Sequence, residues 1–127
     1  MEKGNYEGSA FTGREAVAGL RAGVGVRVIT PPVSVPLGGY AARVEPARGV
    51  HDDLHARAVV LEAGGERAAL VSLELLYATR ELVEEVRRVC EEEAGIPQDS
   101  VMVAAVHTHS GPSLVGFHST PRHGYLE

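Results

Sequence analysis

The sequence predicts an α/β fold: a mixed β-sheet with a βαβ unit and one helix that covers the sheet. Four short apolar stretches are typical of strands, and one longer stretch has the spacing of an amphipathic helix. The helix lies between the last two strands, and this order favours a parallel pair joined by a crossover helix. At 127 residues the chain has the size of one domain with a modest core.

The first predicted strand covers residues 22–30, and the next two form a hairpin. Residues 22–30 alternate small or apolar side chains with others, and two prolines follow. Residues 54–62 and 67–75 are also strand-like, and the Gly-Gly pair between them is typical of a hairpin turn. Residues 33–48 carry prolines and glycines, so we expect this segment to be mostly loop.

The clearest helix covers residues 79–94. Its apolar residues recur at a spacing of 3.6 and lie on one stripe, namely Leu82, Val83, Val86, Val89 and Cys90. Thr79 has the side chain of a good N-cap, and Gly95 followed by Pro97 ends the helix. The fourth strand follows at residues 101–106, a short valine-rich run that is typical of a buried strand.

Composition and charge exclude several classes of protein. The net charge of −5 and the scattered basic residues argue against a nucleic-acid surface. No stretch of about 18 apolar residues occurs, so we expect no transmembrane helix. The N-terminus lacks the pattern of a signal peptide, and the single Cys90 rules out an intrachain disulfide. We therefore expect a cytoplasmic protein.

Two histidines directly follow the fourth predicted strand, in the run His-Thr-His-Ser-Gly-Pro at residues 107–112. Because side chains alternate along a strand, His107 and His109 are predicted to project from the same face. Ligands in open α/β sheets bind beyond the carboxyl ends of strands, and paired imidazoles there suit metal binding or proton transfer. The alternative is that both are surface histidines at a strand end.

Three further polar residues stand out. His51 precedes two aspartates that could orient its imidazole, although the same residues also fit a polar turn. Glu74 interrupts an apolar strand, so it lies either at an exposed strand end or beside a partner such as a histidine. Arg57, within a strand, is expected to form an ion pair, whereas His55 is expected to face solvent.

Several blocks of sequence occur in an order and spacing that match a known family. They are residues 22–32 (AGVGVRVITPP), 37–40 (LGGY), 49–51 (GVH) with 56–58 (ARA), 70–74 (LVSLE) and 106–112 (VHTHSGP). Together they resemble the N-terminal part of the catalytic domain of the neutral/alkaline (non-lysosomal) ceramidases. The histidine block is the strongest of these matches.

The resemblance implies hydrolysis of the amide bond of N-acylsphingosine at a single zinc ion, in sphingolipid metabolism. It implies that His107 is a zinc ligand and that His109 lies close by and binds substrate or stabilises the oxyanion. It also favours a role near the site for His51, as an additional ligand or as support for one. The family commonly has an aspartate where this chain has Glu74, for which a hydrogen bond to a histidine is the preferred functional interpretation. The remaining family ligands, a histidine, a glutamate and a tyrosine, come from much further along a longer chain.

We therefore divide the chain into a loose N-terminal arm (1–21), a ceramidase-like segment (22–112) and a flexible tail rich in Gly, Pro and His (113–127). The segment is expected to be part of a larger catalytic domain that acts on a small-molecule lipid amide. Alone it should be weakly active or inactive, because a missing C-terminal polypeptide would have to complete the site. The alternative is a small standalone α/β module that binds a metal or an anion without catalysis and is completed by forming a homo-oligomer.

Overall fold

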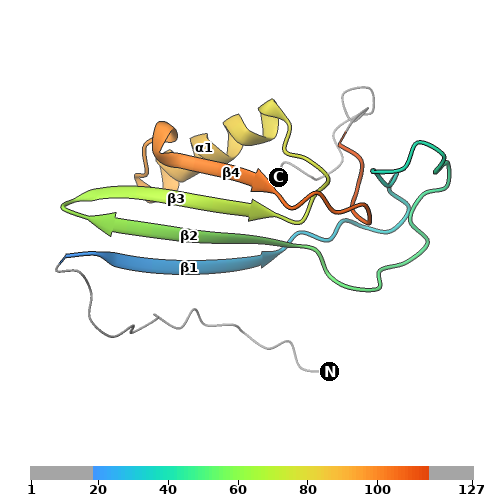
Figure 1. Cartoon of the computed structure of the whole chain (residues 1–127), viewed down its shortest axis with the longest axis horizontal. Helices are drawn as coiled ribbons and strands as arrows, with labels where there is room; N and C mark the ends of the chain where they lie inside the picture. The colour runs from blue at the N-terminus through green and yellow to red at the C-terminus, as the bar shows by residue number, and fades with distance from the viewer. Residues whose placement is uncertain (1–18, 115–127) are drawn as a thin grey trace.

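The computed structural model describes residues 19–114 and contains one mixed four-stranded sheet with one long helix. The elements in chain order are β1 (Arg21–Val28), β2 (His55–Ala63), β3 (Glu66–Leu73), α1 (Arg80–Ala94), the short 3₁₀ helix η1 (Gln98–Ser100) and β4 (Val101–Ala105). The strands follow one another across the sheet in the order β1-β2-β3-β4 (Figure 1). The predicted α/β fold with a mixed sheet is therefore confirmed.

The strand pairing follows from the lengths of the connections. A two-residue turn joins β2 to β3, and its glycines, Gly64 and Gly65, have φ angles of 61° and 86°, which β-branched residues avoid. This turn makes β2 and β3 antiparallel, and β1 pairs antiparallel with β2. The connection through α1 and η1 is long enough to bring β4 back parallel to β3.

Helix α1 has the caps that its sequence predicts. The Thr79 hydroxyl accepts a hydrogen bond from the Leu82 amide at 3.2 Å. At the other end Gly95 has a φ of 62°, and its amide donates to the Glu91 carbonyl at 3.1 Å. The helix thus begins and ends within one residue of the predicted range. No helix in the described part of the chain is long and apolar enough to span a membrane.

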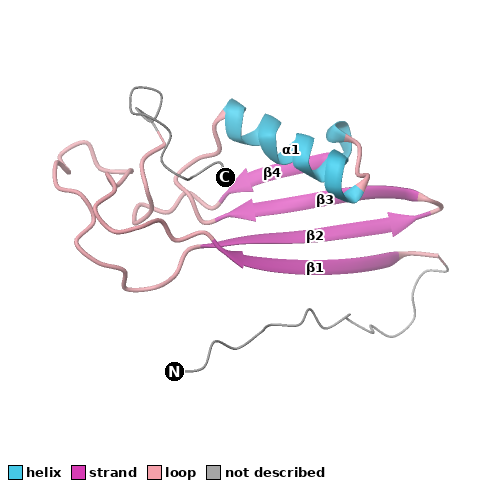
Figure 2. Ribbon diagram, turned by 180° about the vertical axis from the view of Figure 1, so that it is seen from behind, coloured by secondary structure: helices cyan, strands magenta, loops and turns pink. Residues whose placement is uncertain are grey.

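The core lies between α1 and the sheet. Ala69, Ile96 and Val101 are each only 2% exposed and form its centre. The half-buried apolar residues packed around this centre are Val60, Val71, Val86, Cys90 and Val103. Figure 2 shows α1 over β3 and β4, whereas all eight residues of β1 are exposed. The helix therefore covers only part of one face of the sheet.

The opposite face of the sheet is apolar and exposed. Val24, Val59, Leu70 and Met102 are direct partners on the four strands, so they form one row across that face. Val24, Leu70 and Met102 are 58%, 48% and 61% exposed, and Val26 beside them is 62% exposed. We call this surface, defined by these five residues, the open face.

Three loops gather at one end of the sheet. The segments 29–54, 74–79 and 106–114 follow the carboxyl ends of β1, β3 and β4, which all point the same way in Figure 1. The candidate residues at positions 51, 74, 107 and 109 all fall in these segments. β1 begins at Arg21, one residue inside the predicted arm; the rest of that arm up to residue 18, and the tail from residue 115, lie outside the described residues.

The N-cap of α1 can be tested by substitution of Thr79. Thr79→Ala should lower the free energy of unfolding by about 1 kcal/mol, because the Leu82 amide loses its acceptor. Thr79→Ser keeps the hydroxyl and is the matched control. Urea unfolding followed by circular dichroism measures both variants. An equal loss of unfolding free energy in Thr79→Ala and Thr79→Ser would mean that the Thr79 methyl group, and not the hydroxyl cap, stabilises the helix.

Candidate functional site

The two histidines of the 107–112 run lie side by side, but for a different reason from the one predicted. β4 ends at Ala105, and His107 has a φ of 65°, so strand alternation does not continue to His109. The amides of His107 and Thr108 both donate to the Leu75 carbonyl, at 3.0 and 3.2 Å, and turn the backbone there. The two imidazole centroids are 4.9 Å apart at an angle of 72°.

The left-handed backbone at His107 is itself informative. A residue with a Cβ rarely adopts a positive φ, which costs about 1–3 kcal/mol and tends to occur where function requires it. In the described residues His107 shares this property with Ser34 alone among non-glycine residues. The strain is borne by the residue that the family resemblance implies as a zinc ligand.

The ring of His107 is oriented by the main chain. Its Nδ1 lies 2.7 Å from the Leu76 carbonyl oxygen. Because a carbonyl oxygen only accepts, Nδ1 carries the hydrogen and donates it, and Nε2 keeps its lone pair. Metal-binding histidines commonly have this arrangement, with one nitrogen on a carbonyl and the other free for the metal. The side chain is exposed, so Nε2 is accessible.

His109 is half-buried beneath the loop between β1 and β2. Gly39 has a φ of 101°, and a Cβ on it would lie 2.6 Å from Cγ of His109. Tyr40 contacts the same ring edge-on, with centroids 4.9 Å apart. A hydrogen bond from the Gly38 amide to the Gly111 carbonyl, at 3.0 Å, holds the two segments together. The Leu-Gly-Gly-Tyr block therefore shapes the histidine loop, which its sequence alone did not reveal.

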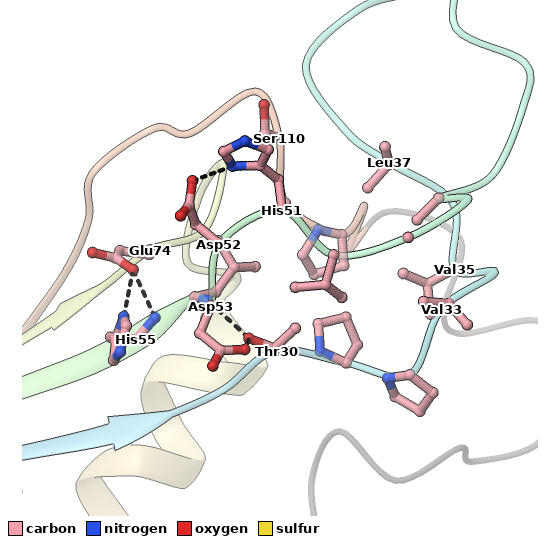
Figure 3. Close-up of a pocket in the computed structure, with 18 of the residues that line it drawn as sticks. Thr30, Val33, Val35, Leu37, His51, Asp52, Asp53, His55, Glu74 and Ser110 are labelled. Carbon is pink, nitrogen blue, oxygen red and sulfur yellow. Dashed lines mark hydrogen bonds and ion pairs between the residues drawn. The ribbon is translucent and has the colours of Figure 1, made fainter. Parts of the chain in front are cut away.

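A pocket of about 640 Å³ adjoins the histidine loop (Figure 3). It lies between the loop that follows β1, the start of β2 and residues 110–112. Its apolar side includes Val33, Val35 and Leu37, and its polar side includes Glu74 and the segment 51–55. The rings of His107 and His109 are not among its lining residues, so the pocket borders the histidine pair and does not enclose it.

Glu74 is the centre of a polar cluster in this pocket. Its Oε1 forms an ion pair with Arg57, and its Oε2 accepts from the His55 amide at 2.7 Å and lies 3.2 Å from His55 Nδ1. The predicted ion pair of Arg57 is confirmed. Glu74 does contact a histidine, but it is His55, whose half-buried side chain had been expected to face solvent. The Arg57 guanidinium holds the pKa of Glu74 below its ordinary value of 4.5.

His51 lies at the rim of the pocket, with its side chain 97% exposed. Its Nδ1 lies 2.6 Å from a carboxylate oxygen of Asp52, so one of the two neighbouring aspartates does contact the ring. This carboxylate raises the pKa of His51. Asp53 instead accepts a hydrogen bond from the Thr30 hydroxyl at 2.7 Å. A metal-binding or supporting role for His51 stays a prediction.

The described residues do not by themselves form a metal site. A catalytic zinc ion needs about three protein ligands and one open position. His107 offers a free Nε2 and His109 lies beside it, but residues 19–114 contain no group of three His, Cys, Asp or Glu side chains that could hold a metal ion. The remaining ligands would have to come from outside these residues.

Comparison with known proteins identifies the family. The model of the neutral/alkaline non-lysosomal ceramidase N-terminal region matches residues 20–122. The chain belongs to this family. All four candidate residues, His51, Glu74, His107 and His109, fall within the matched range.

Ceramidases of animals, plants and bacteria are similar to this chain over only a small part of their own length. The neutral ceramidase of Drosophila pseudoobscura pseudoobscura is 36% identical over 101 residues, which is 76% of this chain and 14% of the relative. Neutral ceramidase 2 of Arabidopsis thaliana is 34% identical over 94 residues, 71% of this chain and 12% of the relative. The crystal structure of Pseudomonas aeruginosa neutral ceramidase has a TM-score of 0.68 and 32% identity, over 75% of this chain and 16% of that one.

The polar cluster generates a prediction on pH. Arg57→Ala should raise the pKa of Glu74 toward 4.5, because the guanidinium is the largest cause of its lowering. A carboxyl group with a lowered pKa in the folded state stabilises the fold above its unfolded pKa, and this stabilisation is lost as the pH falls through the lowered value. The wild-type protein should therefore lose more stability than Arg57→Ala as the pH falls from about 5 through the lowered pKa of Glu74.

Carbon-13 NMR titration of the glutamate carboxyl groups measures the pKa, and urea unfolding at several pH values measures the stability. Arg48→Ala, which removes a different ion pair in an exposed loop, is the matched control. A Glu74 pKa that is the same in wild type and Arg57→Ala would contradict the assignment.

Proposed function

We propose that this chain is the N-terminal segment of a ceramidase-like, zinc-dependent amide hydrolase that acts on N-acylsphingosine or a related lipid amide. His107 is one zinc ligand, and His109 is the catalytic residue beside it. One observation carries the proposal: the Leu76 carbonyl accepts from Nδ1 of His107 and leaves Nε2 free for a metal. Because residues 19–114 hold no third ligand near the pair, we expect the 127-residue chain alone to be weakly active or inactive.

The residues of the chain would have the following roles in amide hydrolysis. Zinc, when bound, would act as a Lewis acid that polarises the amide carbonyl. His107 would bind it through Nε2, with the ring held in place by Leu76. His109, whose ring centre is 4.9 Å from that of His107, would donate an N–H to the carbonyl oxygen as negative charge develops on it. The adjoining pocket, with its apolar side around Val35 and Leu37, would take part of the lipid amide.

The segment is one part of a larger catalytic domain. Its open face leaves Val24, Val26, Leu70 and Met102 about half or more exposed, and soluble monomers rarely leave such a contiguous apolar surface uncovered. The curated relatives are about seven times longer than the part that this chain matches. Their length supports the view that further polypeptide packs on the open face and supplies the missing zinc ligands.

A chimeric enzyme tests the proposal. In it, residues 20–122 of this chain replace the matching segment of the P. aeruginosa neutral ceramidase. We expect the chimera to bind zinc and to hydrolyse N-acylsphingosine. His107→Ala in the chimera should remove the zinc and lower kcat/KM by more than about 100-fold, since even loss of an outer partner of a metal ligand costs 10–100-fold. Metal analysis and the release of sphingosine are the measurements.

Arg48→Ala is the control, because it removes an exposed loop side chain that pairs with Glu45 and has no proposed role at the site. Unchanged zinc content in His107→Ala would contradict the proposed ligand. Tight zinc binding by the 127-residue chain itself, together with an inactive chimera, would instead favour a metal-binding module without catalysis.

The open face generates a second prediction. We expect the 127-residue chain to self-associate as its concentration rises, and Val24→Lys to weaken this association by about tenfold or more in Kd, because a charge there would have to be buried. Val44→Lys places the same charge on a loop residue that is 91% exposed and should have no effect. Sedimentation velocity measures the association. Equal behaviour of the two variants would contradict a role for the open face.

A further inference from the structure

One arginine links the loop between β1 and β2 to the histidine loop. Nη1 of Arg43 donates to the His109 carbonyl at 2.8 Å and to the Gly38 carbonyl at 3.1 Å. Arg43 and His109 are 66 positions apart in the sequence, so these two bonds join distant segments of the chain. Since a guanidinium nitrogen of this kind carries two hydrogens, one atom can satisfy both carbonyls.

The same guanidinium also lies against Tyr40, whose ring contacts the ring of His109. Its central carbon lies 4.8 Å from the centre of the Tyr40 ring, at cation–π distance. Tyr40 in turn contacts the His109 ring edge-on, with centroids 4.9 Å apart. Arg43 therefore acts on His109 twice: directly at its backbone, and through Tyr40 at its imidazole.

The arrangement depends on a planar cation. Lysine could carry the charge, but it has no flat face to lie against Tyr40 and no fixed geometry of donors. Gly39, between Tyr40 and Gly38, approaches His109 too closely for any side chain, so the turn and the ring are fitted to one another. Arg43 is half-buried in this turn, and its amide donates to the Tyr40 carbonyl at 3.1 Å, which closes the turn.

We propose that Arg43 is a positioning residue for His109. It fixes the histidine loop and the direction of the imidazole through the His109 carbonyl and Tyr40, and it contacts no reacting atom. The catalytic meaning of this position rests on the function proposed above, whereas the positioning itself is a property of the chain that can be measured without zinc or substrate.

NMR spectroscopy of the full 127-residue chain tests the positioning. In wild-type protein we expect strong nuclear Overhauser effects between the ring protons of Tyr40 and His109. Arg43→Ala should weaken them at least threefold and shift the His109 ring resonances, while the backbone resonances of α1 and β3 stay in place. Arg43→Lys keeps the charge and the aliphatic stem but loses the planar donors, so its effects should lie between those of wild type and Arg43→Ala. Arg48→Ala, an exposed arginine in the same loop, should match wild type.

Unchanged Tyr40–His109 contacts in Arg43→Ala would overturn the proposal, and so would an equal loss in Arg48→Ala. If Arg43→Ala does not fold, Arg43→Lys takes its place: its Tyr40–His109 Overhauser effects should be weaker than those of wild type, and effects equal to wild type would overturn the proposal. In the chimeric ceramidase, Arg43→Ala should lower kcat about tenfold and leave the zinc content unchanged. An inactive chimera with the NMR result intact would reject the proposed function and leave the positioning role standing.

Discussion

The candidate site depends on the carbonyl groups that follow β3. The β3–β4 pairing continues beyond the strands: the amide of Val106 donates to the Leu73 carbonyl, and two further amides donate to that of Leu75. The next carbonyl, Leu76, accepts from the His107 ring. Main-chain groups in register with the sheet therefore set both the turn and the direction of the imidazole. Helix α1 contributes by keeping β3 and β4 parallel and by covering the apolar side chains at their centre.

His109 is held in a different way. Its environment comes from the Gly-Gly-Tyr turn, which lies far away in the sequence and contributes a backbone approach, an aromatic ring and a guanidinium. Close approach at Gly39 requires a residue without a Cβ, because φ there is positive and the ring occupies the space. The two histidines are therefore close in space, but different segments of the chain hold them in place.

Local signals in the sequence were sufficient for the elements of the fold and insufficient for the site. The Gly64–Gly65 turn, the Thr79 cap and the Gly95 stop are each encoded within a few residues, so their positions could be predicted closely. The turn at His107 could not, because it depends on carbonyl groups of another strand. The partner of Glu74 was missed for a similar reason: His55 lies next to it only once β2 and β3 pair. Arg43 gave no local signal at all, since its partner is 66 residues away.

The partial cover of the sheet by α1 has a consequence for motion. β3 and β4 lie against the helix and the buried centre, whereas every residue of β1 is exposed, and the loop that carries Gly39 and Tyr40 leaves from β1. Segments with few buried contacts open locally at lower free energy than core strands, and their amides exchange faster. We therefore expect opening at the β1 side to loosen the support of His109 before that of His107.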